Sequence, residues 1–342
     1  MKHWLEGSVR SGFSIDYEDE DITYKSIKRV VSEEKYDLVV PMSDFFATIL
    51  SKHKEMLSIF SNIYVNDWGT YEKAIDKLQT MRICMERGIP CPQTALSFEI
   101  NEIKKKWKFP VVIKPRSSFG AKGFSIANTL EELTDAFPKT EQKFGPSLIQ
   151  EYIPQNDKQY QVEMLMDKNG ECKAFVLMDK VRWYPINGGS STMNITIHDD
   201  IIKDNCVKLL REIGWRGYAS MDVIRDPRDG VAKIMEINPR MNGTAKICFA
   251  AGVNLCILIL QDAFEDVVES QLEYRDDIRL RYFHMDLLWF IKSKQRFKAF
   301  PSWFSLKNTI DEIFGWDDLR PAFFYTITAF SKLFHDKEKR KI

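Results

Sequence analysis

A carboxylate and an amide two residues apart, followed by a proline and an arginine, mark the most chemically suggestive segment of the chain. Glu236 and Asn238 lie in an apolar run that predicts a strand, so their side chains should project from the same face. Pro239 ends this strand and Arg240 follows it. Oxygen ligands beside a fixed cation suit a magnesium-bound polyphosphate, because proteins hold Mg²⁺ through one or two carboxylates plus substrate phosphates. An ordinary polar strand end is the alternative interpretation.

A second carboxylate precedes this segment in another short apolar run, Met221–Ile224, which contains Asp222. Residues 225–230 read RDPRDG, which is typical of a hairpin turn. Two antiparallel strands would place Asp222 across from Glu236. Facing carboxylates repel each other unless a cation lies between them, which favours a metal site over two exposed acids.

A lysine ends the strand predicted at Phe109–Arg116, and a loop of small residues follows it before a second strand at 124–127. Lys114 supplies a point charge, and the glycines of loop 117–123 let backbone amides approach an anion closely. The Walker A spacing is missing, and a plain hairpin would show the same Gly-x-x-Gly pattern. Further on, Ser147–Pro154 predicts a buried strand that runs into a hinge, whose backbone could pair with an adenine edge.

In this order the segments resemble the ATP-grasp superfamily, most closely its branch of carbamoyl phosphate synthetase-like carboxylate–amine ligases. The resemblance covers residues 73–265. It implies a two-lobed α/β (α+β) fold, preceded by a shortened Rossmann-like unit and followed by an aromatic-rich C-terminal region. It also implies ATP and Mg²⁺ as cofactors, with Mn²⁺ as a substitute for Mg²⁺.

The resemblance carries roles to individual residues. The implied catalytic residues are Lys114 and Arg240, and the implied metal ligands are Asp222, Glu236 and Asn238. The implied nucleotide-binding residues are Lys77, Lys114, Ser117, Ser118, Gly120, Gly123, Glu151, Tyr152, Ile153 and Gln159. Gln159 stands where the family usually has a ribose-binding glutamate, and its amide can still bond a ribose hydroxyl.

Substrate residues vary most within this family, so they are interpreted here from their chemistry. Lys180 and Arg182 in a predicted strand could hold a carboxylate, and Ser190 and Ser191 lie in a Gly-Gly-Ser-Ser-Thr loop that resembles the family loop near the γ-phosphate. For Lys180 and Arg182, a solvated strand is the alternative.

The predicted activity is ATP-dependent joining of a carboxylate to an amine through an acyl phosphate, with ADP and phosphate released. The partners would be small-molecule carboxylates and amines. The alternative is an ATP-binding regulatory or scaffolding protein of the same fold without turnover, which the shortened N-terminal unit and Gln159 favour. The complete set of metal ligands favours the enzyme.

Composition narrows the class of protein. The 342 residues include 49 basic and 49 acidic side chains, and this balance argues against a nucleic-acid-binding role. The six cysteines form no Cys-x-x-Cys pair and are predicted to be buried thiols in a reducing compartment. Neither a signal peptide nor a transmembrane segment is predicted, so we expect a cytoplasmic protein.

Four parts are predicted along the chain. Residues 1–72 form the shortened Rossmann-like unit, 73–150 the linking helix and first lobe, 151–265 the second lobe, and 266–342 an aromatic-rich extension. In the first part, helices are expected at 22–32 and 44–54, with strands at 37–41 and 63–65. A missing edge strand there would favour a homodimer. The aromatics of the extension are predicted to pack on the second lobe, and peripheral membrane contact is the alternative.

Overall fold

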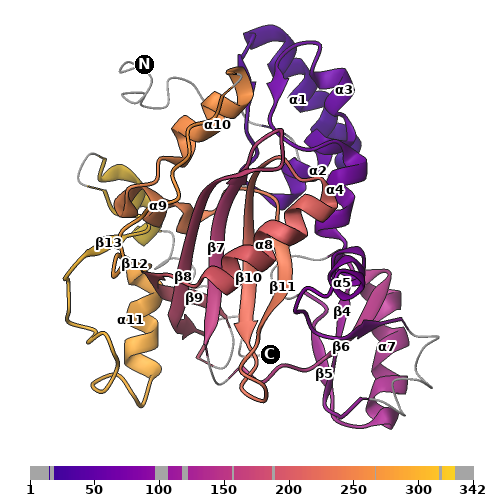
Figure 1. The fold of residues 1–342 in the computed structure, drawn as a ribbon, viewed down its shortest axis with the longest axis vertical. Helices are drawn as coiled ribbons and strands as arrows, with labels where there is room; N and C mark the ends of the chain where they lie inside the picture. The colour runs from indigo at the N-terminus through magenta and orange to yellow at the C-terminus, as the bar shows by residue number, and fades with distance from the viewer. Residues whose placement is uncertain are drawn as a thin grey trace.

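Three β-sheets organise the part of the chain that the computed structural model describes, which comprises residues 15, 19–96, 107–117, 122–155, 158–186, 189–265, 267–315 and 318–327. The largest sheet has seven strands, the next has four, and the smallest has two. Figure 1 shows the large sheet at the centre, with the two-stranded unit above it on the right and the four-stranded lobe below. The mixed α/β architecture predicted from the sequence is therefore confirmed.

The N-terminal unit is a parallel two-stranded sheet packed against three helices. Its elements are α1 (Glu20–Glu34), β1 (Leu38–Val39), α2 (Asp44–Lys52), α3 (Lys54–Leu57) and β2 (Asn62–Ile63). The side chains of Asp19 and Ser43 cap α1 and α2 by accepting hydrogen bonds from backbone amides. The predicted second helix ends at Lys52, two residues earlier than expected, because a separate short helix starts at Lys54.

Two helices lead from this unit into a four-stranded antiparallel lobe, whose strand order is β3-β6-β4-β5. The elements are α4 (Trp68–Ile75), α5 (Lys77–Glu86), β3 (Thr94–Ala95), β4 (Val111–Pro115), β5 (Ser125–Ala127), α7 (Leu130–Phe144) and β6 (Ser147–Glu151). Helix α7 covers the sheet, where its Leu133 and Phe137 pack against Val111, Ile113 and Ile149.

The large sheet has the strand order β11-β10-β7-β8-β9-β12-β13 and is antiparallel except for the last pair. Its strands are β7 (Gln159–Met166), β8 (Cys172–Tyr184), β9 (Ser190–Ile197), β10 (Gly217–Arg225), β11 (Ala232–Asn238), β12 (Arg279–Arg281) and β13 (Thr309–Asp311). Strands β12 and β13 come from the C-terminal region. The large sheet therefore contains strands from both sides of residue 265, where the sequence predicts the end of the second lobe.

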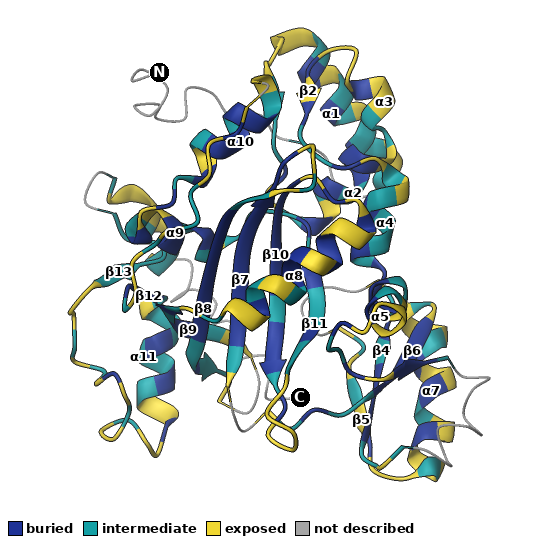
Figure 2. Cartoon of the chain, viewed as in Figure 1, coloured by how far each residue is buried: buried dark blue, intermediate teal, exposed yellow. Residues whose placement is uncertain are grey.

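Helices cover both faces of this sheet, which is buried along its centre (Figure 2). They are α8 (Asp200–Ile213), the 3₁₀ turn η3 (Gly243–Ala245), α9 (Lys246–Ala251), α10 (Leu255–Phe264) and α11 (Phe283–Lys292). One face packs against α4, α5 and α8 through residues such as Val162 and Met221. The opposite face packs against α9 and α10 through residues such as Leu165 and Val176. Val162 and Leu165 of β7 therefore point to opposite faces of the sheet, as residues an odd number of positions apart do in a pleated strand.

None of the single helices in the described ranges has the length and apolarity to cross a bilayer. Only the segments Gly243–Ala251 and Leu255–Phe264 pass this test together, and they are bent by 98° at their junction. The six cysteines are free thiols. The prediction that all are buried is wrong for Cys256, which is exposed, and Cys91 and Cys172 are only half-buried.

Candidate active site

Asp222 and Glu236 face each other across an antiparallel hairpin, as the sequence predicted. They are direct partners in the β10–β11 register, and a bulge follows, so that Val223 pairs with Ile234. Asn238 lies two residues further along β11, and its Nδ2 donates to Asp222 Oδ2 at 3.4 Å. The three side chains therefore meet on one face of the large sheet.

Three lysines from separate parts of the chain gather around these carboxylates. Lys180 of β8 makes a short ion pair with Asp222, and Lys77 Nζ lies 3.5 Å from Glu236 Oε2. Burial lowers the pKa of Lys114 to about 8, the Glu236 carboxylate opposes this shift, and the Lys77 ammonium adds to it. Three positive and two negative groups leave a surplus of positive charge, which suits an anionic ligand.

The position of Lys77 follows from a contact between α5 and β4. Asp76 caps α5 by accepting from Leu78 N at 3.0 Å, and it also accepts from Arg116 Nε at 3.0 Å. The Lys77 amide donates to Arg116 O at 3.0 Å. These bonds join the first residue of α5 to the end of β4, which brings Lys77 close to Lys114.

The oxygen ligands fit a hard divalent cation only in part. No group of three or more His, Cys, Asp or Glu side chains within the described residues is placed to hold a metal ion. Two carboxylates and one amide oxygen from Asp222, Glu236 and Asn238 would supply part of an octahedral shell. Phosphate oxygens and water would complete it, which is the usual arrangement for Mg²⁺. The lysine ion pairs neutralise the facing carboxylates in the protein alone.

The structure describes residue 117 and residues 122–123 of the small-residue loop after β4. Ser117 is exposed, whereas Ser118 and Gly120 lie outside the described residues. Gly123 has a φ of +77°, and a Cβ on it would come within 2.6 Å of Pro115 Cγ. This position therefore requires glycine for both its backbone conformation and its close approach to Pro115.

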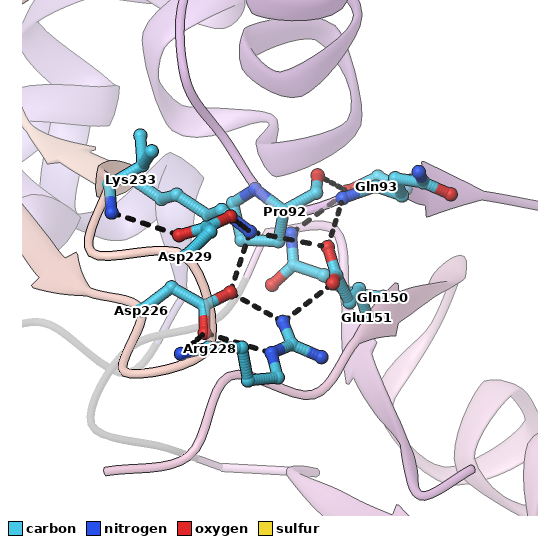
Figure 3. A network of polar contacts seen from close by, with 10 residues as sticks. Pro92, Gln93, Gln150, Glu151, Asp226, Arg228, Asp229 and Lys233 are labelled. Carbon is cyan, nitrogen blue, oxygen red and sulfur yellow. Dashed lines mark hydrogen bonds and ion pairs between the residues drawn. The ribbon is translucent and has the colours of Figure 1, made fainter. Parts of the chain in front are cut away.

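The side chain of Glu151 at the predicted hinge is already bonded. Its carboxylate accepts from Arg228 Nη2 at 2.6 Å and from Gln93 N at 3.2 Å (Figure 3). Arg228 also pairs with the buried Asp226, which Lys233 contacts at 2.7 Å. Hydrogen bonds from Arg228 hold the pKa of Asp226 far below its usual range. The network joins the β10–β11 turn to the first lobe, and the Glu151 backbone amide also donates to Gln93 O at 2.8 Å. A nucleotide contact at Glu151 stays a prediction.

The other predicted nucleotide residues lie nearby on the chain. Tyr152 is half-buried, and Ile153 is buried. Gln159 is the first residue of β7 and pairs in register with Lys180 of β8, so it lies beside the lysine that contacts Asp222. A ribose contact at Gln159 stays a prediction.

Arg182 does not share the site with Lys180. A bulge between the two residues breaks the β8–β9 register, so Lys180 pairs with Asn194 while Arg182 pairs with Met193. The Arg182 side chain is 1% exposed, and its Nε and Nη2 donate to Asp286 at 2.7 and 3.1 Å. The prediction that Arg182 holds a substrate carboxylate is therefore wrong, because its guanidinium is buried against Asp286. The alternative of a solvated strand is also wrong for this residue.

Asp286 compensates two buried arginines, since Arg281 Nε also donates to it at 2.7 Å. We expect Asp286→Ala to lower the free energy of unfolding by about 3–5 kcal/mol, because both guanidinium groups lose their buried partner. Denaturant unfolding measures this change. The exposed Asp135 of the Lys139 pair provides the control, and Asp135→Ala should cost less than about 0.5 kcal/mol. Equal effects of the two substitutions would contradict the structural role of Asp286.

Ser190 and Ser191 begin β9 opposite Tyr184 and Trp183. Ser190 is exposed and Ser191 is half-buried. In the register they lie several residues from Asn194, the partner of Lys180. A substrate contact at these serines stays a prediction.

Arg240 points toward the N-terminal unit, where its Nη2 lies 3.0 Å from Asp44 Oδ2. It lines a cavity of about 360 Å³ together with Tyr64, Arg216 and Asp262. Asp262 accepts from Tyr64 Oη at 2.9 Å and from Arg216 Nε at 3.0 Å. The cavity has a volume suited to a small ligand and a polar wall that adjoins the end of β11.

Glu163 and Glu312 are two acidic residues that no local motif indicates. Glu163 is fully buried, and its carboxylate accepts from Thr244 Oγ1 at 2.6 Å and from Gln161 Nε2 at 3.0 Å. Burial raises its pKa to about 7. Glu312 lies against the Cα of Gly243, since a Cβ on that glycine would come within 2.1 Å of Glu312 Oε1. Burial also raises the pKa of Glu312 to about 7.

The sequence of this chain matches a known protein family. Residues 74–244, half of the chain, match the family model of the ATP-grasp domain, and the chain belongs to this family. Among curated relatives, D-aspartate ligase of Enterococcus faecium is 26% identical over 261 residues, which covers 69% of this chain and 60% of that protein. The large chain of carbamoyl phosphate synthase from Neisseria meningitidis is 23% identical over 251 residues, which covers 68% of this chain and 23% of that protein.

Solved structures share the fold at low sequence identity. Biotin carboxylase from Campylobacter jejuni superposes with a TM-score of 0.66 and 14% identity, over 77% of this chain and 63% of that chain. L-amino acid ligase from Bacillus licheniformis gives a TM-score of 0.55 and 18% identity, over 74% of this chain and 62% of that chain. The chain spans less than two thirds of these relatives and neighbours, so the match concerns the shared domain.

Proposed function

We propose that this protein is an ATP-dependent ligase that joins a carboxylate to an amine and releases ADP and phosphate. The observation that carries the proposal is the convergence of Asp222, Glu236 and Asn238 with three lysines on one face of the large sheet. A binding protein could hold a nucleotide without so many charged groups at one point. The D-aspartate ligase of the preceding comparison supports the same reaction class.

In this mechanism Asp222, Glu236 and Asn238 would hold Mg²⁺, with Mn²⁺ as a substitute. The ion supplies charge neutralisation at the transferring phosphoryl group. Lys77 and Lys114 orient the phosphates and offset their charge. The substrate carboxylate attacks the γ-phosphorus and displaces ADP, which gives an acyl phosphate. An amine then attacks the acyl carbon, and phosphate leaves as the amide forms. No protein nucleophile is needed.

Arg240 lies between the proposed metal site and the cavity that it lines. Pro239, Arg240 and Met241 line the cavity directly after the metal-binding strand. We place an acceptor substrate there, so that its reacting group lies between Arg240 and the phosphates. The alternative, a regulatory protein of the same fold without turnover, would use the same cavity only for binding.

The test measures nucleotide products from the purified full chain with Mg-ATP and a panel of amino acids and carboxylic acids. We expect ADP and phosphate, and hydroxylamine should trap a hydroxamate when the correct carboxylate is supplied without an amine. Release of AMP and pyrophosphate would contradict the acyl-phosphate route. Tight Mg-ATP binding without cleavage across the panel would favour the regulatory alternative.

Lys114 gives a pH-dependent prediction. With its pKa near 8 in the protein alone, Lys114 loses its proton as the pH rises above about 8, and a neutral amine no longer attracts phosphate. We expect the affinity for Mg-ATP to fall by up to about tenfold per pH unit above that value. Calorimetry at about pH 7 and about pH 9 measures the change.

The matched ligand is adenosine, whose affinity should stay constant over the same range because it carries no phosphate. Lys114→Ala should weaken Mg-ATP binding far more than adenosine binding and should abolish the pH dependence. An equal loss for both ligands would place Lys114 away from the phosphates.

A further inference from the structure

A strongly basic, aromatic segment begins in the last turn of α11 and covers residues 290–307; we call it the basic aromatic segment. It reads FIKSKQRFKAFPSWFSLK and carries five basic residues and no acidic one, although the whole chain has a formal net charge of zero. Four of its large apolar side chains are among the most exposed of the protein. They are Phe297 (74%), Phe300 (89%), Phe304 (63%) and Leu306 (74%).

The rings of Phe297 and Phe304 belong to one patch, and Phe300 lies between them in the sequence. Phe290 makes edge contacts with Phe297 and Phe304, at centroid distances of 5.5 and 5.6 Å, and it packs against Trp303 at 4.5 Å. Rings that share Phe290 as a neighbour must lie close together. Exposed apolar surface of this kind marks an interaction site when it is contiguous.

The patch is held in place from behind by buried polar contacts. Trp303 Nε1 donates to Asp286 O at 3.2 Å, and its ring lies 4.2 Å from the Arg281 guanidinium. Arg182 Nη1 donates to Pro301 O at 3.0 Å, directly after Phe300. The backbone is therefore anchored to the large sheet, while the Phe297 and Phe300 side chains face outward.

The positive charge of the basic aromatic segment indicates the chemistry of its partner. Lys292, Lys294 and Lys298 of the same segment are exposed, and Lys307 Nζ lies 3.9 Å from Asp277 Oδ2. A twofold contact with a second copy would bring the same basic patch against itself, which is repulsive. A surface of anionic lipid headgroups matches both features, since it attracts lysines and accepts aromatic rings at the headgroup level.

We propose that the basic aromatic segment docks this protein on an anionic lipid bilayer, with Phe297, Phe300 and Phe304 inserted among the headgroups. This surface lies on the C-terminal region, outside residues 74–244 that match the family model. The proposal is independent of the reaction that the active site performs.

Vesicle sedimentation tests the proposal with the full chain. We expect the protein to pellet with vesicles of phosphatidylcholine and phosphatidylglycerol, to stay in solution with phosphatidylcholine alone, and to be released by added salt. The double variant Phe297→Ser/Phe300→Ser and the charge reversal Lys294→Glu/Lys298→Glu should each lower partitioning about tenfold or more.

The matched control is Ile201→Ser, which removes another exposed apolar side chain (73%) on α8. It should leave partitioning unchanged. Equal loss in the control and the Phe variants, or no pelleting with anionic vesicles, would overturn the proposal. Concentration-dependent dimers that the Phe variants abolish would instead assign the patch to self-association.

Discussion

Glu236→Gln should abolish nucleotide turnover while leaving the fold intact. The substitution is nearly isosteric but removes one of the two carboxylates that we assign to the metal. We expect kcat for ADP release to fall at least about a thousandfold, because the transferring phosphoryl group loses its charge-neutralising ion. Asn238→Ala should act in the same direction but less strongly, since a neutral oxygen contributes less to binding a dication.

Stability separates this effect from unfolding. Glu236 is partly exposed and its contact with Lys77 spans 3.5 Å, so loss of the ion pair should change the free energy of unfolding by less than about 1 kcal/mol. Glu171→Gln is the matched control, because Glu171 also pairs with a lysine, Lys173, at 2.7 Å but is remote from the site. Wild-type turnover in a folded Glu236→Gln protein would remove the central metal assignment.

The hairpin that carries Asp222 and Glu236 could be predicted because its determinants are local in sequence. A turn-forming hexapeptide between two apolar runs sets the β10–β11 register, which places Asp222 opposite Glu236. The strand at Lys114 could be predicted for the same reason, although it is one to two residues shorter at its ends than expected.

The rest of the site depends on non-local pairing that one sequence does not specify. The strand order β10-β7-β8 brings Lys180 to Asp222, 42 residues away in the chain. The bulge after Lys180 then turns Arg182 to the opposite face, where simple alternation would have kept both residues together. Glu312, which lies against Gly243, directly follows β13, a strand that pairs with β12 at the edge of the large sheet.

The exposure of the C-terminal aromatic side chains could not be predicted from the sequence either. Trp289 is buried, as expected for a side chain that packs on the second lobe, whereas Phe297 and Phe300 of the same region are exposed. Composition alone could not separate these two groups, because both lie in one aromatic-rich stretch. Trp289 lies on α11, where its ring centroid is 5.1 Å from the Arg182 guanidinium, whereas Phe297 and Phe300 lie in the loop that follows this helix.

Arg240→Lys separates an enzyme from a binding protein. If the guanidinium stabilises charge that develops as the phosphoryl group transfers, the lysine variant should bind Mg-ATP within about threefold of wild type. Its turnover should nevertheless fall by about a hundredfold or more, because lysine keeps the charge but loses the planar fork that holds two oxygens at once. Calorimetry and ADP release measure the two quantities.

The contact of Arg240 with Asp44 at 3.0 Å supplies the control, since Asp44→Asn removes the ion pair and retains the guanidinium. Turnover that survives in Asp44→Asn and fails in Arg240→Lys would assign the effect to the reacting groups. Equal losses in both variants would reduce Arg240 to a link between the N-terminal unit and the large sheet.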